Sequence, residues 1–236
     1  MLPLLLSALL AASPAAPVVE VRALSFDEPR IALAVEGDAG KPQPLTLHSH
    51  ALTHGLKLRC PEGRLTFYRE GKDPEGKPLL VPAVAAAVPP EGGTFLAVVH
   101  GRGERLAMSL IPDTGNRTGG GTLRIFNLCN RPLGLNFPGA REVLAPGRDF
   151  LLRPAVKAED YGQGQFLLAD GEEWKVAGGL RWLQLEDVRT LWFVMPDPSQ
   201  PGIVSFRGIE ERIAPEPVVA PPANGAATAA RKPAAR

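Results

Sequence analysis

Three of the four histidines lie within seven residues, in the run His48-Ser49-His50-Ala51-Leu52-Thr53-His54. On an extended strand, positions 48 and 50 point to the same face, and such a pair can bind zinc or copper through imidazole nitrogens. His54 could fold back after a turn, and Cys60 or His100 could supply a fourth ligand. The run therefore indicates a candidate metal site at His48, His50 and His54. An exposed strand and loop without an ion is the alternative that we favour, because the spacing matches no standard site and no acidic residue lies nearby to orient the imidazoles.

The two cysteines, Cys60 and Cys129, are too far apart in the sequence to form a CxxC redox motif. In an exported protein they would form a disulfide if their Cα atoms lay within about 7 Å. Such a bond would join the two halves of the chain. The alternative is a pair of buried thiols that act as small apolar side chains.

Sequence signatures of nucleophilic hydrolysis are absent, because the chain has no Gly-x-Ser-x-Gly, HExxH or Cys-centred protease motif. The adjacent carboxylates of Glu172-Glu173 and of Glu210-Glu211 would point to opposite faces of a strand, so neither pair forms a catalytic dyad. Carboxylates distant in sequence, such as Asp160 and Asp187, could still pair in space as a glycosidase requires. The sequence leans against an enzyme and predicts no cofactor.

All three tryptophans, Trp174, Trp182 and Trp192, lie in the second half of the chain. If they are exposed, they could form a flat surface on which sugar rings stack. If they are buried, they belong to the core of a domain. Burial is the interpretation that we favour, because leucines surround two of them in the sequence.

Composition and charge limit the class of protein. The 236 residues include 25 Gly and 25 Pro, which is too many helix breakers for a helix bundle or coiled coil. Lys and Arg number 26 against 25 Asp and Glu, so there is no basic field that would attract nucleic acid.

The N-terminal residues 1–15 resemble a secretory signal peptide. Residues 2–12 form an apolar run that is too short to span a bilayer, and small residues suited to cleavage after Ala15 follow it. We therefore expect an exported protein, periplasmic or secreted, that is soluble and has no transmembrane segment in its mature chain.

Beyond the signal, short apolar runs alternate with turn residues at intervals of about 8–12 residues, which is typical of an all-β sandwich. We expect two consecutive immunoglobulin-like β-sandwich domains, residues 17–111 and 122–213, joined by a Gly-rich linker, residues 112–121. Asp170-Gly171 is a hairpin signal within the second domain. No internal repeat is visible in the sequence. Residues 214–236 are rich in Pro and Ala and are predicted to be a disordered tail.

Several runs resemble a group of uncharacterised exported bacterial β-sandwich proteins. The likeness rests on Arg124-Ile125-Phe126-Asn127 followed by Pro132-Leu133, and on Arg189-Thr190-Leu191-Trp192-Phe193 near the end of the second half. The first half carries the matching strand Leu65-Thr66-Phe67-Tyr68-Arg69. The resemblance covers most of the mature chain and implies a β-sandwich fold. It implies no functional residue, because these motifs carry no established chemistry.

We therefore expect an exported, non-catalytic β-sandwich protein that serves as an envelope or secreted interaction or structural module. Its partner is not identified; an envelope protein or a polysaccharide would fit. The first alternative is a carbohydrate-active or carbohydrate-binding protein, which an exposed aromatic beside facing carboxylates would favour. The second is a periplasmic metal-binding protein that uses His48, His50 and His54.

Overall fold

The structure is a computed structural model that describes residues 16–36, 42–113, 119–197 and 199–213. Strands make up nearly all the regular structure of these residues, and the one helical element among them is a short 3-10 turn, Pro61–Gly63. The prediction of an all-β protein built from sandwiches is therefore confirmed. The predicted signal peptide (residues 1–15) and the predicted tail (residues 214–236) lie outside the described residues.

The first sandwich consists of two four-stranded sheets. One has the strand order β4(Leu56–Arg59), β1(Val18–Ser25), β7(Gly93–Arg102), β8(Arg105–Pro112). The other has the order β3(Pro42–His48), β2(Arg30–Glu36), β5(Arg64–Lys72), β6(Pro78–Ala87). Aliphatic and phenylalanine side chains from both sheets fill the space between them, with Phe67, Leu65 and Leu47 among the most deeply buried.

The second sandwich is built in the same way. One sheet has the order β12(Asp149–Leu152), β9(Thr122–Asn127), β15(Val188–Pro196), β16(Val204–Arg212). The other has the order β11(Ala140–Leu144), β10(Leu133–Phe137), β13(Tyr161–Asp170), β14(Glu173–Leu183). Its core contains Phe166, Ile125, Leu133 and the buried ring of Trp182.

Both sandwiches have one strand order. When the strands of each are counted from its own first strand, the sheets read 4-1-7-8 and 3-2-5-6 in both cases. In both, the first and seventh strands pair in parallel, β1 with β7 and β9 with β15, while all other pairs are antiparallel. The architecture is therefore duplicated, although the sequence shows no repeat.

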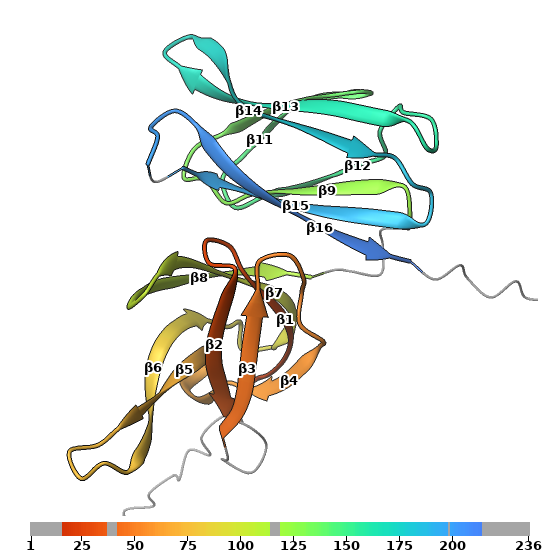
Figure 1. The fold of residues 1–236 in the computed structure, drawn as a ribbon. Helices are drawn as coiled ribbons and strands as arrows, with labels where there is room; N and C mark the ends of the chain where they lie inside the picture. Colours follow the sequence, from red (N-terminus) through yellow and green to blue (C-terminus); the bar gives the residue numbers. More distant parts are fainter. Residues whose placement is uncertain (1–15, 37–41, 114–118, 198, 214–236) are drawn as a thin grey trace, which may run out of the picture.

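A third hydrophobic cluster joins the sheet of β1 to the sheet of β9. These two sheets lie at the junction of the two sandwiches (Figure 1). Its buried members from the first sandwich are Leu24, Phe26, Leu96, Val98 and Ile111, and those from the second are Phe126, Leu191, Phe193 and Ile209. Along β7, Phe95, Ala97 and Val99 point into the core of the first sandwich, whereas Leu96 and Val98 point into this cluster. Both faces of the strand are thus buried, which is why its sequence is a continuous apolar run rather than an alternating one.

The end of the predicted Gly-rich linker is packed against the second sandwich. A side chain at Gly120 would place its Cβ 2.0 Å from the carbonyl oxygen of Glu186. The Gly121 N–H donates to the Val188 carbonyl at 2.8 Å, and its φ of 73° lies in the left-handed region. Glycine is required here for close contact and turn geometry, so this end of the segment has a fixed position.

Candidate functional site

The structure brings together two of the three histidines of the predicted metal site. The rings of His48 and His50 lie with their centroids 5.4 Å apart. Among the described residues, no group of three or more His, Cys, Asp or Glu side chains is placed to hold a metal ion. His54 and His50 instead line a small hollow beside β16, together with Glu210 and Glu211 of the second sandwich. The histidine run therefore lies where the loop after β3 reaches the other sandwich.

The two cysteines lie in different hydrophobic cores and are both free thiols. Burial raises the pKa of the Cys60 thiol. Burial also raises the pKa of the Cys129 thiol, to about 11, although the charge of Arg131 opposes this shift. The structure does not join the two cysteines, and burial makes both of them poor nucleophiles.

Asn127, the last residue of the run 124–127, has a structural role. The side chain of Asn127 is fully buried. Its Nδ2 donates to the carbonyls of Leu144 at 2.8 Å and Arg131 at 3.0 Å, and its Oδ1 accepts from the Cys129 N–H at 2.9 Å. Asn127 therefore fixes the turn between β9 and β10, which explains why a polar residue ends a strand that is otherwise buried.

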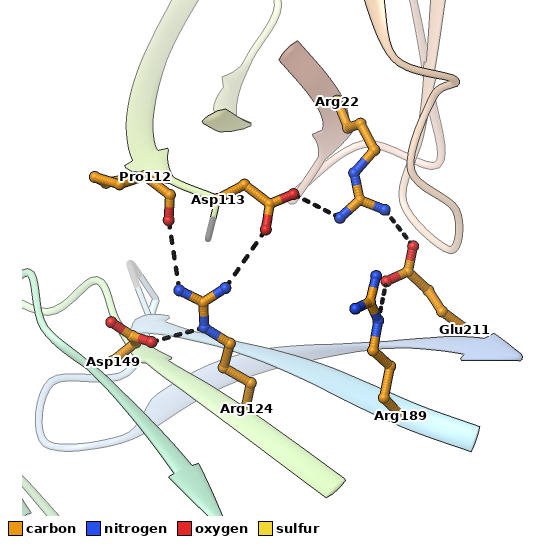
Figure 2. A network of polar contacts seen from close by, with 7 residues as sticks. All are labelled: Arg22, Pro112, Asp113, Arg124, Asp149, Arg189 and Glu211. Carbon is orange, nitrogen blue, oxygen red and sulfur yellow. Dashed lines mark hydrogen bonds and ion pairs between the residues drawn. The ribbon is translucent and has the colours of Figure 1, made fainter. Parts of the chain in front are cut away.

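Arg124 belongs to a network of charges at the junction between the sandwiches (Figure 2). Its Nε donates to Asp149 at 2.6 Å, and its Nη1 lies 3.5 Å from the carboxylate of Asp113. Asp113 also accepts from Arg22 at 2.7 Å, and Arg22 pairs in addition with Glu211 of the second sandwich. Glu211 accepts a further bond, from Arg189, at 2.9 Å.

The ion pairs of this network outweigh the effect of burial on Arg22. Burial alone would lower the pKa of Arg22, but its hydrogen bonds and charge interactions with Asp113 and Glu211 outweigh this effect and raise it. The Asp113 side chain is only 5% exposed. We interpret the network as a structural joint that orients the two sandwiches, because each of its carboxylates is paired with at least one arginine.

The tryptophans divide into two groups. Trp182 is buried and donates from Nε1 to Gln184 at 2.9 Å. Trp192 is partly buried against the core, and its ring and that of Phe206 form a T-shaped pair. Trp174 is different, because 42% of it is exposed. The preference for burial is therefore confirmed for Trp182 and is wrong for Trp174, which lies beside the polar tip of the β13–β14 hairpin rather than among core strands.

Trp174 lies on the side of the β11-β10-β13-β14 sheet that points away from the core. The strand registers place Trp174, Val176, Gly179 and Arg181 of β14 opposite Ala169, Leu167, Gln165 and Gln163 of β13 on this side. They also place Asn136 opposite Gln165, and Arg141 opposite Asn136. We call this surface the Trp174 face and define it by its side chains: Asn136, Arg141, Val143, Tyr161, Gln163, Gln165, Leu167, Trp174, Val176 and Arg181.

The Trp174 face has an apolar end and a polar end, and each is hollowed. At the apolar end, a hollow of about 850 Å³ is lined by Trp174, Val143 and Leu167, with Arg141 and Glu142 at its side. At the polar end, a hollow of about 910 Å³ is lined by Gln163, Gln165, Arg141 and Arg181, above Gly179. Asn136 and Arg141 line both hollows, so the two are adjacent. Both are wide open to solvent, as expected on an exposed sheet face rather than in an enclosed cavity.

The sequence held a partial signal for this face. Gln163, Gln165 and Leu167 alternate with buried residues along β13, and Asp170-Gly171 fixed the hairpin that places Trp174 opposite Ala169. The contribution of β10 and β11 could not be found from the sequence, because it depends on which strands become neighbours. Glu172 and Glu173 lie exposed at the hairpin tip.

Comparisons with known proteins assign this chain to no family: no family model matches it, and no curated protein matches it. Among solved structures, it is similar to a protein of Bacteroides eggerthii described as a "putative cell adhesion protein", with 9% sequence identity, a TM-score of 0.24 and coverage of 86% of this chain and 97% of the other. A likeness this distant says nothing about function, so a functional conclusion has to rest on the chemistry of the site.

In the part of the chain that the structure describes, no helix has the length and apolar character needed to cross a membrane.

Proposed function

We propose that this protein is an exported, non-catalytic binding module that contacts a partner in the cell envelope or outside the cell through the Trp174 face. The observation that carries the proposal is the exposure of Trp174, Val176 and Val143, which are 42%, 55% and 60% exposed on one side of a single sheet. Exposed apolar groups gathered beside polar ones are typical of interaction sites. The charged groups at the junction of the sandwiches support a non-catalytic role, because they pair with one another and serve to join the sandwiches.

The joint between the sandwiches supports a module that presents its faces in a fixed orientation. Buried side chains from six strands and a network of paired charges hold the sheet of β1 against the sheet of β9. The Trp174 face belongs to the opposite sheet of the second sandwich. It therefore points away from the joint and is accessible to a large partner.

The experiment is co-sedimentation of the purified protein with insoluble cell-envelope material. We expect the wild-type protein to sediment and the Trp174→Ala variant to stay largely in solution. Leu79→Ala is the matched control, because Leu79 is 49% exposed on β6 of the other sandwich. Equal sedimentation of wild type and Trp174→Ala would contradict the proposal.

Export is tested separately by mass spectrometry of the protein from a host that secretes it. We expect a new N-terminus close to Ala16, produced by cleavage after Ala15. A chain that keeps Met1 and stays in the cytoplasmic fraction would contradict export without touching the binding face.

A further inference from the structure

We propose that the partner of the Trp174 face is an anionic polysaccharide, with one sugar ring stacked on Trp174 and carboxylate groups held by Arg141 and Arg181. The inference rests on the proposed binding role of this face and names the chemistry of its ligand. Four features of the face carry it: the position of the indole, the amides beside it, the two arginines, and the distribution of acidic residues.

The side chain of Trp174 reaches from β14 across β13 to Gly134 of β10. A Cβ built at Gly134 of β10 would come within 3.0 Å of the Trp174 ring and 3.1 Å of Leu167. The ring thus occupies the space that a side chain at position 134 would take, and it packs against the sheet there. Since 42% of Trp174 remains exposed, part of the indole is open to solvent. A supported, half-open aromatic ring suits the apolar face of a pyranose ring.

Amide side chains follow Trp174 along the face. Asn136 Nδ2 donates to Gln165 Oε1 at 3.0 Å, which holds both side chains in place and leaves other donor and acceptor positions of the two amides for a ligand. Gln163 lies two residues along β13 and lines the same hollow. Gly179, opposite Gln165, adds no side chain to the floor of this hollow. Neutral groups that both donate and accept match the hydroxyls of a sugar.

Two arginines make the polar end of the face cationic. Arg141 and Arg181 line the hollow, and its lining residues include no Asp or Glu. The guanidinium of Arg181 lies over the ring of Tyr161, 4.0 Å from its centroid. This contact holds the side chain in position, which lowers the entropy that it loses on binding. Guanidinium groups bind carboxylates with two parallel hydrogen bonds, so the pair favours an acidic ligand.

Acidic residues set the direction in which such a ligand would lie. Asp170, Glu172 and Glu173 are at the tip of the β13–β14 hairpin, beyond Trp174, where Asp170 pairs with Lys175 and the two glutamates leave an acidic excess. Glu142 lines the hollow at the Trp174 end. Negative groups of the ligand are therefore disfavoured at the hairpin tip and favoured at Arg141 and Arg181. Arg181 lies about 20 Å from Trp174, for strand residues that rise about 3.3 Å each. A chain of sugar rings can contact Trp174 and Arg181 together, whereas a single sugar or a free anion cannot.

The experiment uses three probes on the full chain: a hexamer of galacturonic acid, the same hexamer with its carboxylates methyl-esterified, and polyphosphate. Binding is measured by calorimetry and by quenching of tryptophan fluorescence. We expect the acidic hexamer to bind and to quench, and the esterified hexamer to bind about tenfold more weakly, equivalent to about 1.4 kcal/mol. We expect polyphosphate, which has charge but no sugar rings, to cause no quenching.

Three variants assign the binding to the face. Trp174→Ala should weaken binding of the acidic hexamer about tenfold, and Trp174→Phe should keep most of the affinity while losing the quenching signal. Arg141→Gln with Arg181→Gln should remove the preference for the acidic over the esterified hexamer. Arg212→Gln is the matched control, since Arg212 has an 82% exposed side chain away from this face, and it should change nothing.

The inference is overturned if Trp174→Ala binds the acidic hexamer as tightly as wild type. It is also overturned if polyphosphate displaces the acidic hexamer equally well from wild type and from Trp174→Ala. It is also overturned if no acidic or esterified hexamer binds while the envelope sedimentation still depends on Trp174. In that last case the proposed binding role stands, and the face binds a partner of another chemical class.

Discussion

Arg22 and Arg124 occupy the same position in the two sandwiches, and both contact Asp113. Arg22 pairs with Leu96 on the neighbouring seventh strand, and Arg124 pairs with Leu191 on its own. Those two leucines pair with Ile111 and Ile209 on the eighth strands, and the carboxylates Asp113 and Glu211 follow two residues later. The joint therefore brings together two copies of one arrangement. It has the form of a two-fold symmetric interface, in which each side contributes the same surface.

The shared carboxylate gives the first prediction. Asp113→Asn should lower the free energy of unfolding by about 3 kcal/mol, because it leaves two arginines at the joint without their common partner. Asp187→Asn is the control: Asp187 is 56% exposed and lies 3.9 Å from Arg212, so its loss should change stability little. Urea unfolding measures both. Equal stability of Asp113→Asn and wild type would show that the network contributes no net stability.

A second prediction concerns the coupling of the two sandwiches. Phe193 stacks on Phe126 with the ring centroids 4.9 Å apart, and both rings belong to the cluster between the sandwiches rather than to either core. Phe193→Ala should cost about 3–5 kcal/mol and should separate one calorimetric unfolding transition into two. Phe166→Ala is the comparison, because Phe166 lies in the core of the second sandwich. A single transition in the Phe193→Ala variant would contradict the assignment.

The third prediction is a pH dependence that arises from His100. Burial lowers the pKa of His100 below its ordinary value of 6.5, although the charge of Asp27 opposes this shift. The folded protein therefore binds this proton less readily than the unfolded chain, so stability should fall as the pH drops below about 6.5. In His100→Gln, the difference in melting temperature between about pH 7.5 and about pH 5 should be smaller. An unchanged difference would assign the pH dependence to other groups.

The fourth prediction tests the state of the cysteines. With a raised pKa and a buried position, Cys60 and Cys129 should react slowly with iodoacetamide at about pH 8 in the native protein. After denaturation without reductant, mass spectrometry should show two alkylated thiols. A chain that gains no alkyl groups until a reductant is added would instead support the disulfide between Cys60 and Cys129.

Much of the fold could be predicted from the sequence because strands and hairpins depend on local signals. The turn after Asp170 is an example: Gly171 has a φ of 65°, and the two strands of this hairpin begin and end beside it. The duplicated strand order could not be predicted, since it depends on which strands become neighbours. The two sandwiches share this strand order but have different side chains at equivalent positions, such as Leu24 in one and Phe126 in the other.

The candidate site was harder to predict, because exposure is decided by tertiary structure. Trp174 and Trp182 are eight residues apart on one strand, yet one supports an open surface and the other fills the core. The bulge in the pairing of β13 with β14, between Phe166 and Leu167, separates these two regions of the strand. The composition of the histidine run predicted a metal site, whereas the structure places no third ligand beside His48 and His50 among the described residues.

The central position of β1 affects the order in which the chain can fold. Its parallel partner is β7, and the pairing of Val19 with Gly93 joins residues 74 positions apart. Because the entropy of closing such a long loop opposes the pairing, sheets of this kind form slowly. The first sandwich cannot complete this sheet until β7 has been synthesised, and the second depends in the same way on β15. The delay is built into each sandwich separately, since each has its own first and seventh strands.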